Sequence, residues 1–365
     1  MPADHPVVII GAGQAGLSVS YYLTQAGVTH VVLDKGAVAG AWAARWDSFC
    51  LVTPNWTINL PGQPYSGGDP DGFLARDDLV AYLQRWAADF GAPVRTGVEV
   101  HGVARDGDGF ALATSDGRLT AAAVVVATAT HQAPKIPALA DQLPARIAQI
   151  HAEAYRNPAQ LDDGAVLVVG SGQTGCQIVE DLLRARRDVY FCVCRAGRLP
   201  RRYRGRDCIA WQCDFGFLDR TPDQLESPAQ RFASDPHVSG RDGGTTISLH
   251  DFHRRGVTLT GRLVGVEGAT LQFDDTLADE IAFADAFAAR FYATVDAYIA
   301  HHKLTAPAPT VAERAGGPEP GDPSLTPPRT LAPDAAGIGT VIWATGFSYD
   351  FSWIDFPVTD GFGYP

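Results

Sequence analysis

Two kinds of apolar spacing alternate at the start of the chain and predict a strand, a helix and a second strand. Residues 7–10 form an uninterrupted apolar run, which is typical of a buried parallel strand. The glycine-rich stretch GAGQAG follows, and apolar residues then recur at helical spacing as far as Leu23, with Gly27 as the stop. A second apolar run ends at Asp34. The opening therefore predicts a βαβ unit.

The same pattern returns near the middle of the chain. The run VLVV is followed by GSGQTG, by a stretch of helical spacing through Leu183, and by VYFCVCR. Two related nucleotide-binding units in one chain predict an α/β protein with two Rossmann-like dinucleotide-binding domains.

The segment between the two units has a mixed pattern. Residues 36–75 are rich in glycine, proline and aromatic residues and predict an irregular segment that lines a site. Residues 76–90 have apolar side chains at helical spacing and predict an amphipathic helix ended by Gly91. Short strand-like runs separated by glycines occupy residues 93–127, and they predict a small antiparallel β-meander that ends in a buried strand.

The remainder contains one long helix and one long loop. Residues 276–304 predict a helix, whereas the proline-rich residues 307–333 predict an exposed or crossing segment. The run GTVIWATGF then returns to strand character.

Composition narrows the class of protein. Hydrophobic residues are 46% and charged residues 19%, so the chain can bury a core and is not disordered. A formal net charge of -12 disfavours binding to nucleic acid or to an anionic membrane. The start of the chain lacks the features of a secretory signal, which predicts a cytoplasmic protein. The six cysteines predict neither a disulfide framework nor a metal site.

The two glycine motifs indicate which cofactors bind. In a G-x-G-x-x-G turn the first glycine permits the tight turn, the second admits a pyrophosphate, and the third packs the helix on the strand. The first unit ends in Asp34, whose carboxylate suits ribose hydroxyls and repels a 2′-phosphate. The second ends in Arg195, whose guanidinium suits a 2′-phosphate. The sequence therefore predicts FAD on the first unit and NADPH on the second.

These motifs resemble those of the class B flavin monooxygenases, the superfamily of flavin-containing monooxygenases, Baeyer–Villiger enzymes and YUCCA-type proteins. The resemblance rests on GAGQAG, on AGAW at residues 39–42 (with Gly40 and Trp42) where the family has G-G-x-W, on GSGQTG, and on the ATGF linker that begins at Ala344. A more specific resemblance is to uncharacterised bacterial flavoproteins of nitrilase gene clusters, which have a motif similar to RYRGRD.

The resemblance implies a monooxygenase, of a type like enzyme class 1.14.13, that uses FAD, NADPH and O2. Such an enzyme acts through a flavin hydroperoxide on a small nucleophilic or carbonyl substrate. It also implies a discontinuous FAD domain, with a first part at residues 1–158, an inserted NADPH-binding domain at 159–325, and a return at 326–365. The family has a further strand and helix after the linker, so that last part is expected to be cut short.

The expected cofactor-binding residues come from both units and from the segments that match the family. Those of the first unit are Gly11, Ala12, Gly13, Gln14, Ala15, Gly16, Asp34, Lys35, Gly40, Trp42, Arg45, Trp46, Asp47, Val100, Ala127 and Thr128. Those of the second unit and the linker are Gly170, Ser171, Gly172, Gln173, Thr174, Gly175, Arg195, Arg198, Ala344, Thr345 and Gly346.

Two residues are candidates for a catalytic or coupling role. Flavin-containing monooxygenases have an asparagine after G-G-x-W that contacts the flavin–oxygen adduct; here Val52 lies near that position and Asn55 follows. His151 matches the histidine of the family's F-x-G-x-x-x-H motif, although Ala145 and Ile147 replace its first two fixed residues.

Two alternative functions remain open at this point. A flavin disulfide reductase or other NADPH reductase shares the two-dinucleotide plan but needs a cysteine pair facing the flavin. The spacing of Cys208 and Cys213, after the second unit, fits neither known arrangement, and Cys50 is alone after the first. A non-catalytic redox sensor would use the same binding motifs. The sequence does not indicate the oligomeric state or the substrate.

Overall fold

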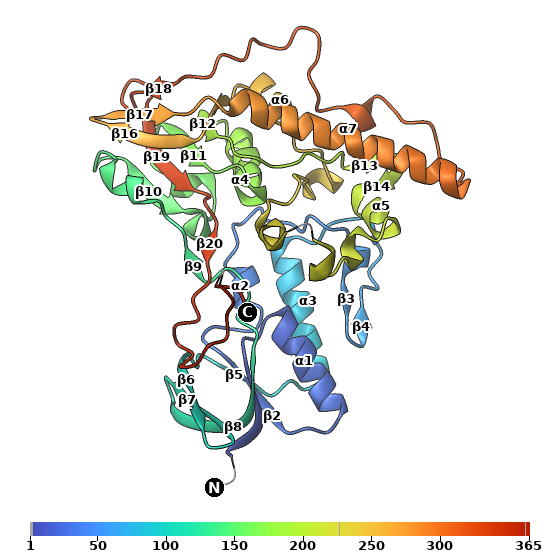
Figure 1. Cartoon of the computed structure of the whole chain (residues 1–365), viewed down its shortest axis with the longest axis vertical. Helices are drawn as coiled ribbons and strands as arrows, with labels where there is room; N and C mark the ends of the chain where they lie inside the picture. The colour runs from blue at the N-terminus through green and yellow to red at the C-terminus, as the bar shows by residue number, and fades with distance from the viewer. Residues whose placement is uncertain (1–2, 226, 362) are drawn as a thin grey trace.

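The computed structural model describes residues 3–225, 227–361 and 363–365. Two parallel-stranded sheets form the centres of two units, the first in the lower part of Figure 1 and the second in the upper part. Irregular segments and a pair of linkers join them.

The first sheet combines a parallel half and an antiparallel half, in the order β5-β2-β1-β8-β7-β6. Strands β1 (His5–Ile10), β2 (His30–Asp34) and β5 (Val94–Thr96) are parallel, and α1 (Gln14–Gln25) connects the first two. Strands β6 (Val100–Asp106), β7 (Gly109–Thr114) and β8 (Gly117–Val126) form the expected antiparallel meander.

Strand β8 joins the two halves because it is long. Its early residues pair with β7, and its later residues, Ala121 to Val126, run parallel to β1. Among the described residues, no strand pairs with Ala122–Val126 on the side away from β1, and the Val126 side chain is exposed. The end of the meander is therefore less buried than the sequence predicts.

The second sheet is parallel throughout, in the order β10-β19-β11-β12-β15. It contains β10 (Ala148–His151), β11 (Ala165–Val169), β12 (Val189–Cys192), β15 (Thr258–Thr260) and β19 (Ile338–Trp343). Helix α4 (Gln173–Arg184) connects β11 to β12, and eight of its 12 residues are buried. The expected fold class, two Rossmann-like units with a small meander, is confirmed.

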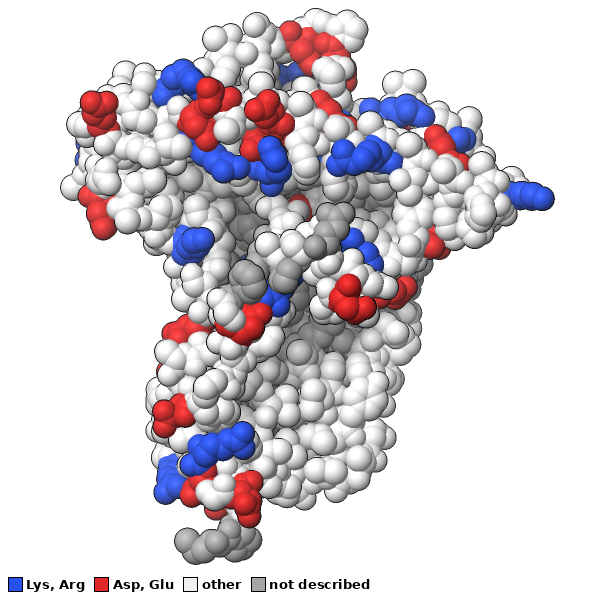
Figure 2. Space-filling model, in the orientation of Figure 1, with Lys and Arg blue, Asp and Glu red and all other residues white. Residues whose placement is uncertain are grey.

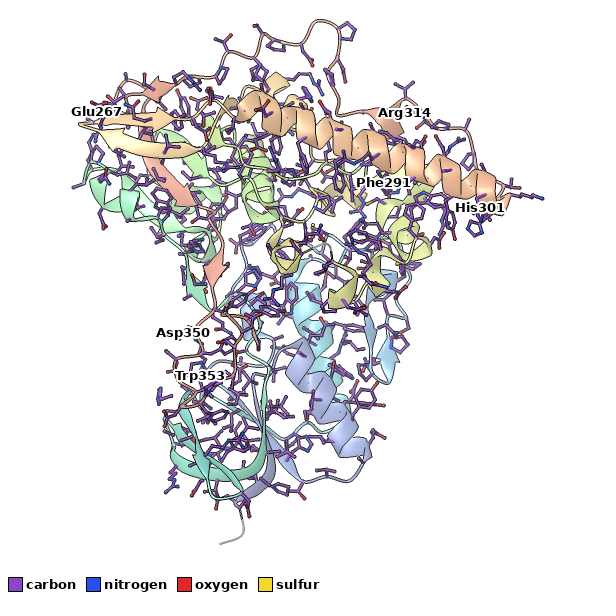
Figure 3. All side chains as sticks on the ribbon, viewed as in Figure 1. Glu267, Phe291, His301, Arg314, Asp350 and Trp353 are labelled. Atoms are coloured by element: carbon purple, nitrogen blue, oxygen red, sulfur yellow. The ribbon has the colours of Figure 1, made fainter. Side chains whose placement is uncertain are left out.

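The pairing of β10 and β19 bears on where the units divide. Both strands lie in the second sheet, although residues 148–151 precede the expected limit at 158 and residues 338–343 follow the one at 325. A strand near the end of the chain completes a sheet that begins near its middle, because β19 inserts between β10 and β11. The chain then returns to the first unit, where the backbone of Trp353 accepts a hydrogen bond from Val103 at 2.9 Å (Figure 3).

Smaller elements surround these sheets. Around the first lie α2 (Gly40–Ala43), β3 (Asn59–Leu60), β4 (Gln63–Pro64) and α3 (Arg76–Asp89). Around the second lie β13 (Arg202–Tyr203), β14 (Arg206–Asp207), α5 (Cys208–Asp214), α6 (Leu249–Arg254), β16 (Leu263–Glu267), β17 (Thr270–Phe273), α7 (Leu277–His302) and β18 (Thr330–Leu331). The long helix α7 crosses the second unit, and the proline-rich segment loops above it (Figure 1).

Candidate functional site

The first glycine turn is built as the motif requires. Gly11 has a φ of +111°, and a Cβ added there would lie 2.4 Å from the carbonyl oxygen of Ala127. A Cβ on Gly16 would lie 1.9 Å from the carbonyl oxygen of Gly11, so helix and strand approach too closely for any side chain. Around Gly13, in contrast, nothing lies within 4 Å of an added Cβ. The backbone therefore packs closely at Gly11 and Gly16 and leaves open space at Gly13.

The second glycine turn repeats this construction. Gly170 has a φ of +105° and would place a Cβ 2.5 Å from the carbonyl oxygen of Ala344, and Gly175 would place one 2.0 Å from that of Gly170. Gly172 has open space around it. In each unit the turn therefore packs against an Ala-Thr linker, which begins at Ala127 in the first unit and at Ala344 in the second.

Both turns leave helix N–H groups available for an anion. Helix α1 begins after Gly13 and α4 begins after Gly172, and neither has a side-chain cap that accepts a hydrogen bond from its first turn. Uncapped N–H groups at a helix start, together with the helix dipole, favour a phosphate group. The open space at the second glycine of each motif is where a pyrophosphate fits, so both sites suit a dinucleotide.

At the end of β2, Asp34 holds the first turn in place. Its Oδ2 accepts a hydrogen bond from the backbone N–H of Ala12 at 2.7 Å, and its Oδ1 accepts one from Gly36 at 2.8 Å. Each carboxylate oxygen keeps a lone pair that ribose hydroxyls can use. The neighbouring Lys35 side chain is exposed.

The arginines after β12 separate into an accessible one and several structural ones. The Arg195 side chain is 58% exposed, and its Nε donates to Glu280 Oε2 at 2.9 Å. Arg198 is buried, and its Nη2 donates to Asp285 at 2.8 Å. Arg201 is buried against Asp207 and a carbonyl of the first unit. Of the two expected phosphate ligands, Arg195 is the one at the surface, whereas Arg198 is buried and its Nε and Nη1 have no hydrogen-bond partner among the described residues.

The segment after α2 carries the residues that match the family's G-G-x-W region. Trp42 is half-buried and its ring centre lies 5.8 Å from that of Phe49, while Trp46 is buried in the hydrophobic core of the second unit. The pKa of Asp47 lies below its usual value because Asn157 and Arg76 donate hydrogen bonds to it. This segment of the first unit is therefore anchored to the second.

Arg45 is one of three expected site residues, with Trp46 and Arg198, that have a buried polar atom without a hydrogen-bond partner among the described residues. Its Nε is buried and has no hydrogen-bond partner among the described residues. Burial lowers the pKa of the guanidinium, and the Glu153 carboxylate opposes that shift. A buried N–H without a partner is costly, so Arg45 fits a role in holding an anionic group that is bound beside it.

His151 lies at the joint between the two units. Its Nδ1 accepts a hydrogen bond from the backbone N–H of Glu153 at 3.2 Å, so Nε2 carries the proton and donates to the carbonyl oxygen of Gly346 at 3.0 Å. Its ring centre lies 4.9 Å from that of Phe347, and the ring centre of His131, from the other linker, lies 4.5 Å from that of the same Phe347. Burial lowers the pKa of His151. This geometry favours the coupling role, and sequence reasoning missed His131.

The two linkers themselves are paired. Strand β9 (Ala133–Pro134) runs antiparallel to β20 (Phe347–Ser348), and the Thr345 hydroxyl donates to the carbonyl oxygen of Lys135. Thr128, in the other linker, accepts a hydrogen bond from Gln132 at 3.1 Å. The expected linker residues thus lie together at the joint.

Asn55 is engaged within its own loop. Its Nδ2 donates to the carbonyl oxygen of Asp69 at 2.9 Å, and its Oδ1 accepts from the backbone N–H of Leu74 at 2.7 Å. The side chain is buried, so these bonds explain its presence as a loop organiser. A contact with flavin stays a prediction, as does that of Val100, which begins β6 and packs on the core of the first sheet.

The candidate pair Cys208 and Cys213 shows no sign of an activated thiol, because burial raises the pKa of both. All six thiols are free, and burial raises the pKa of Cys208 to about 12, so it is a poor nucleophile at neutral pH. Within the described ranges, no cluster of three or more acidic, histidine or cysteine side chains suits a metal ion. No described helix combines the length and apolar character that a bilayer crossing requires.

Surface charge differs between the units. Figure 2 shows that charged side chains gather on the second unit, whereas the face of the first unit around α1 is nearly free of them. On this face a hollow separates the two units, and both basic and acidic side chains lie beside it.

Comparison with known families decides where this construction belongs. Residues 8–203, which contain both glycine turns, match the family described as pyridine nucleotide-disulphide oxidoreductase. The chain belongs to this family. All six cysteines are free thiols, three of them buried and three partly exposed.

Relatives in the same family include flavin monooxygenases. The chain is 36% identical to an uncharacterized oxidoreductase CzcO-like of Geobacillus kaustophilus, over 58% of this chain and 61% of that protein. It is 30% identical to indole-3-pyruvate monooxygenase YUCCA4 of Oryza sativa, over 48% of this chain and 44% of that protein. The matches thus span less than two thirds of these relatives. The expected resemblance to the flavin monooxygenase superfamily is confirmed.

The fold agrees with that of a solved relative. A flavin-containing monooxygenase from Stenotrophomonas maltophilia has a TM-score of 0.60 and 20% identity, with 98% of this chain and 83% of that chain covered. The likeness extends across both units and supports the same overall architecture.

Proposed function

We propose that this chain is an FAD-dependent, NADPH-using oxidoreductase of the monooxygenase type, acting with O2 on a small nucleophilic or carbonyl substrate. The observation that carries the proposal is the pair of glycine turns, built alike but followed by Asp34 in one unit and by Arg195 in the other. A carboxylate favours a dinucleotide without a 2′-phosphate, and a guanidinium favours one that has it. Relatives named as flavin monooxygenases support the same reaction type.

The first unit would hold FAD through residues already described. The turn from Gly11 to Gly16 and the start of α1 would bind its pyrophosphate, Asp34 would accept hydrogen bonds from ribose hydroxyls, and Arg45 would neutralise phosphate charge. The unpartnered Nε of Arg45 and the open space at Gly13 fit this group.

The second unit would hold NADPH at the turn from Gly170 to Gly175. When bound, NADPH supplies a hydride that FAD accepts, and the reduced flavin reacts with O2. The chain's own residues position the two cofactors: His151 ties the second sheet to the linker at Gly346, and the Trp46 segment fixes the first unit against the second. This docking would exclude water from the space between them.

The rival functions predict different chemistry. A disulfide reductase needs a thiolate near the flavin, and buried Cys208 with its raised pKa argues against it. A redox sensor would bind both cofactors without turnover. We also infer a cytoplasmic location, because all six cysteines are free thiols.

The proposal is tested with the purified chain, reconstituted with FAD. We expect yellow protein that consumes NADPH and O2, and that forms little hydrogen peroxide once an oxygenatable amine, sulfide or ketone is present. Peroxide equal to the NADPH consumed with every such substrate would indicate an oxidase. Bound FAD that NADPH does not reduce would indicate a sensor and would contradict the proposal.

A further inference from the structure

A single buried carboxylate holds two arginines at the edge of the second sheet. Glu280 lies in the first turn of α7 and is 2% exposed. Its Oε2 accepts a hydrogen bond from Arg195 Nε at 2.9 Å, and its Oε1 accepts one from Arg262 Nη2 at 3.1 Å. Arg195 and Arg262 are far apart in the sequence, and nothing in the sequence pattern marks Arg262.

The exposure of these groups is the reverse of that in the other ion pairs nearby. In the pairs Arg201–Asp207 and Arg198–Asp285 the guanidinium is buried, with 3% and 7% of the side chain exposed. Around Glu280 the carboxylate is buried and the arginines are open, at 58% and 52%. A buried anchor below two exposed guanidiniums is the arrangement expected of an anion site rather than of a core ion pair.

Hydrogen bonding leaves this site incomplete without an anion. Glu280 faces both guanidiniums, and the Asp274 carboxylate offsets part of the charge of Arg262. Each guanidinium has five N–H groups and, among the described residues, spends one of them on Glu280. Asp274 lies close by, but its Oδ1 is occupied by the backbone N–H of Arg262 and by Thr276. The remaining N–H groups therefore face solvent.

The two arginines lie where the second unit would bind the adenosine half of a dinucleotide. Arg195 follows β12, and Arg262 follows β15, which is the parallel neighbour of β12. The carboxyl ends of parallel strands lie at the same edge of a sheet, which is also the edge of the glycine turn after β11. The ring of Phe283 lies 5.1 Å below the Arg195 guanidinium and further limits its orientation.

We propose that Arg262 and Arg195 together bind the ribose 2′-phosphate of NADPH, and that Glu280 is the positioning residue that orients both guanidiniums. This inference rests on the proposed function and deepens it, because it assigns the preference for NADPH over NADH to a second arginine. A 2′-phosphate carries nearly two negative charges, and two forked guanidiniums match that charge.

Binding of nucleotide fragments tests the proposal without turnover. Isothermal titration of the purified chain with adenosine 2′,5′-bisphosphate and with 5′-AMP gives the ratio of the two affinities. We expect Arg262→Gln to lower the ratio about tenfold, because it should weaken binding of the bisphosphate but not of 5′-AMP. A tenfold change corresponds to the loss of one charge-assisted hydrogen bond. The Arg262→Lys variant keeps the charge but lacks the forked guanidinium, so its affinity ratio should lie between those of Arg262→Gln and the unsubstituted chain.

Arg255→Gln is the matched control. Arg255 is a half-exposed arginine paired with Asp251, and it lies before β15, at the opposite end of the strand from Arg262. This variant should leave the ratio unchanged. If Arg262→Gln also leaves the ratio within twofold of the unsubstituted chain, the assignment of Arg262 is overturned.

Glu280→Gln tests the positioning role separately. It removes a negative charge, so simple electrostatics predicts tighter binding of the bisphosphate, whereas loss of the shared anchor predicts weaker binding. We expect the ratio to fall about fivefold, and a rise would overturn the role of Glu280. If the unsubstituted chain prefers the bisphosphate over 5′-AMP and Arg262→Gln keeps the same affinity ratio, this inference alone is refuted. If the unsubstituted chain has no preference between the two ligands, the NADPH site of the proposed function is refuted as well.

Discussion

The two glycine turns share one backbone plan but are held in opposite ways. In the first unit a side chain from the strand end reaches the turn, because Asp34 accepts the N–H of Ala12 at 2.7 Å. In the second unit the turn reaches the strand end: Ser171 Oγ accepts the N–H of Cys194 at 2.8 Å and donates to its carbonyl at 3.0 Å. The second turn needs no side chain from the strand end, so Arg195 is available for another partner.

Strand register sharpens this contrast. Ile10 lies opposite Leu33 in the first sheet, and Val169 lies opposite Cys192 in the second. Val193 therefore occupies the position of Asp34, and Arg195 lies farther along, on the loop beyond the strand. By sequence alone the two charged residues are equivalent strand ends. The structure separates them, which lets the Arg195 guanidinium reach outward to Glu280.

The largest expected effect comes from the glycines that both turns share. Gly16→Ala and Gly175→Ala each drive a methyl group into a backbone oxygen of the preceding turn, at 1.9 Å and 2.0 Å before relaxation. We expect each to lower the free energy of unfolding by about 3 kcal/mol or more.

Gly13→Ala and Gly172→Ala are the controls in the same two motifs. Nothing lies within 4 Å of a Cβ at either position, so each should change stability by less than about 1 kcal/mol. Urea denaturation of the four variants measures the difference. Equal losses at Gly13 and Gly16 would contradict the assigned geometry.

In the first turn the carbonyl oxygen of Ala12 accepts the backbone N–H of Ala39 at 3.1 Å, whereas in the second turn a histidine holds the equivalent carbonyl oxygen. His237 Nε2 donates to the carbonyl oxygen of Ser171 at 2.5 Å, and burial lowers the pKa of this histidine to about 4. Below its unfolded pKa of about 6.5, the unfolded chain gains a proton that the folded chain does not bind, so stability is lost as the pH falls from 6.5 towards 4.

Between pH 7 and pH 5, His237 should lower the free energy of unfolding by about 2 kcal/mol. His237→Gln keeps a donor but cannot titrate, so it should lose correspondingly less stability over the same interval. Urea titrations at the two pH values measure this difference. Identical pH dependence in the two proteins would show that His237 is not the group responsible.

Local features of the fold were predictable because they depend on neighbouring residues. The glycine turns, α1, α4, α3 and the meander follow from spacing within short windows. The place of β19 was not predictable, because its pairing with β10 and β11 joins residues about 170 to 190 apart in the chain, and no local pattern specifies those partners.

The arginines of the site show the same limit. Arg195, Arg198 and Arg201 look alike in the sequence, and what separates them is the acid that each one meets: Glu280, Asp285 or Asp207. Two of these acids lie on α7, and the sequence does not indicate which face of that helix meets the second sheet. Arg262 cannot be recognised as a site residue until the structure places β15 next to α7.

The smallest expected effect concerns the acid of the first turn. Asp34→Asn keeps the shape of the side chain but replaces one acceptor oxygen with an NH₂ group, so the bond to Ala12 or to Gly36 is lost. We expect FAD to bind about tenfold more weakly, which corresponds to about 1.4 kcal/mol. Fluorescence quenching of FAD on titration with apoprotein measures the affinity, and NADP⁺ affinity serves as the control that should not change.

Rapid mixing of the FAD-loaded protein with NADPH or with NADH, without oxygen, tests most directly whether the two turns serve different dinucleotides. The account predicts that NADPH reduces the flavin with a second-order rate constant at least about 30-fold higher than NADH, as expected for a charge-assisted hydrogen-bond pair worth about 2 kcal/mol. Equal rates with the two nucleotides, or faster reduction by NADH, would contradict it.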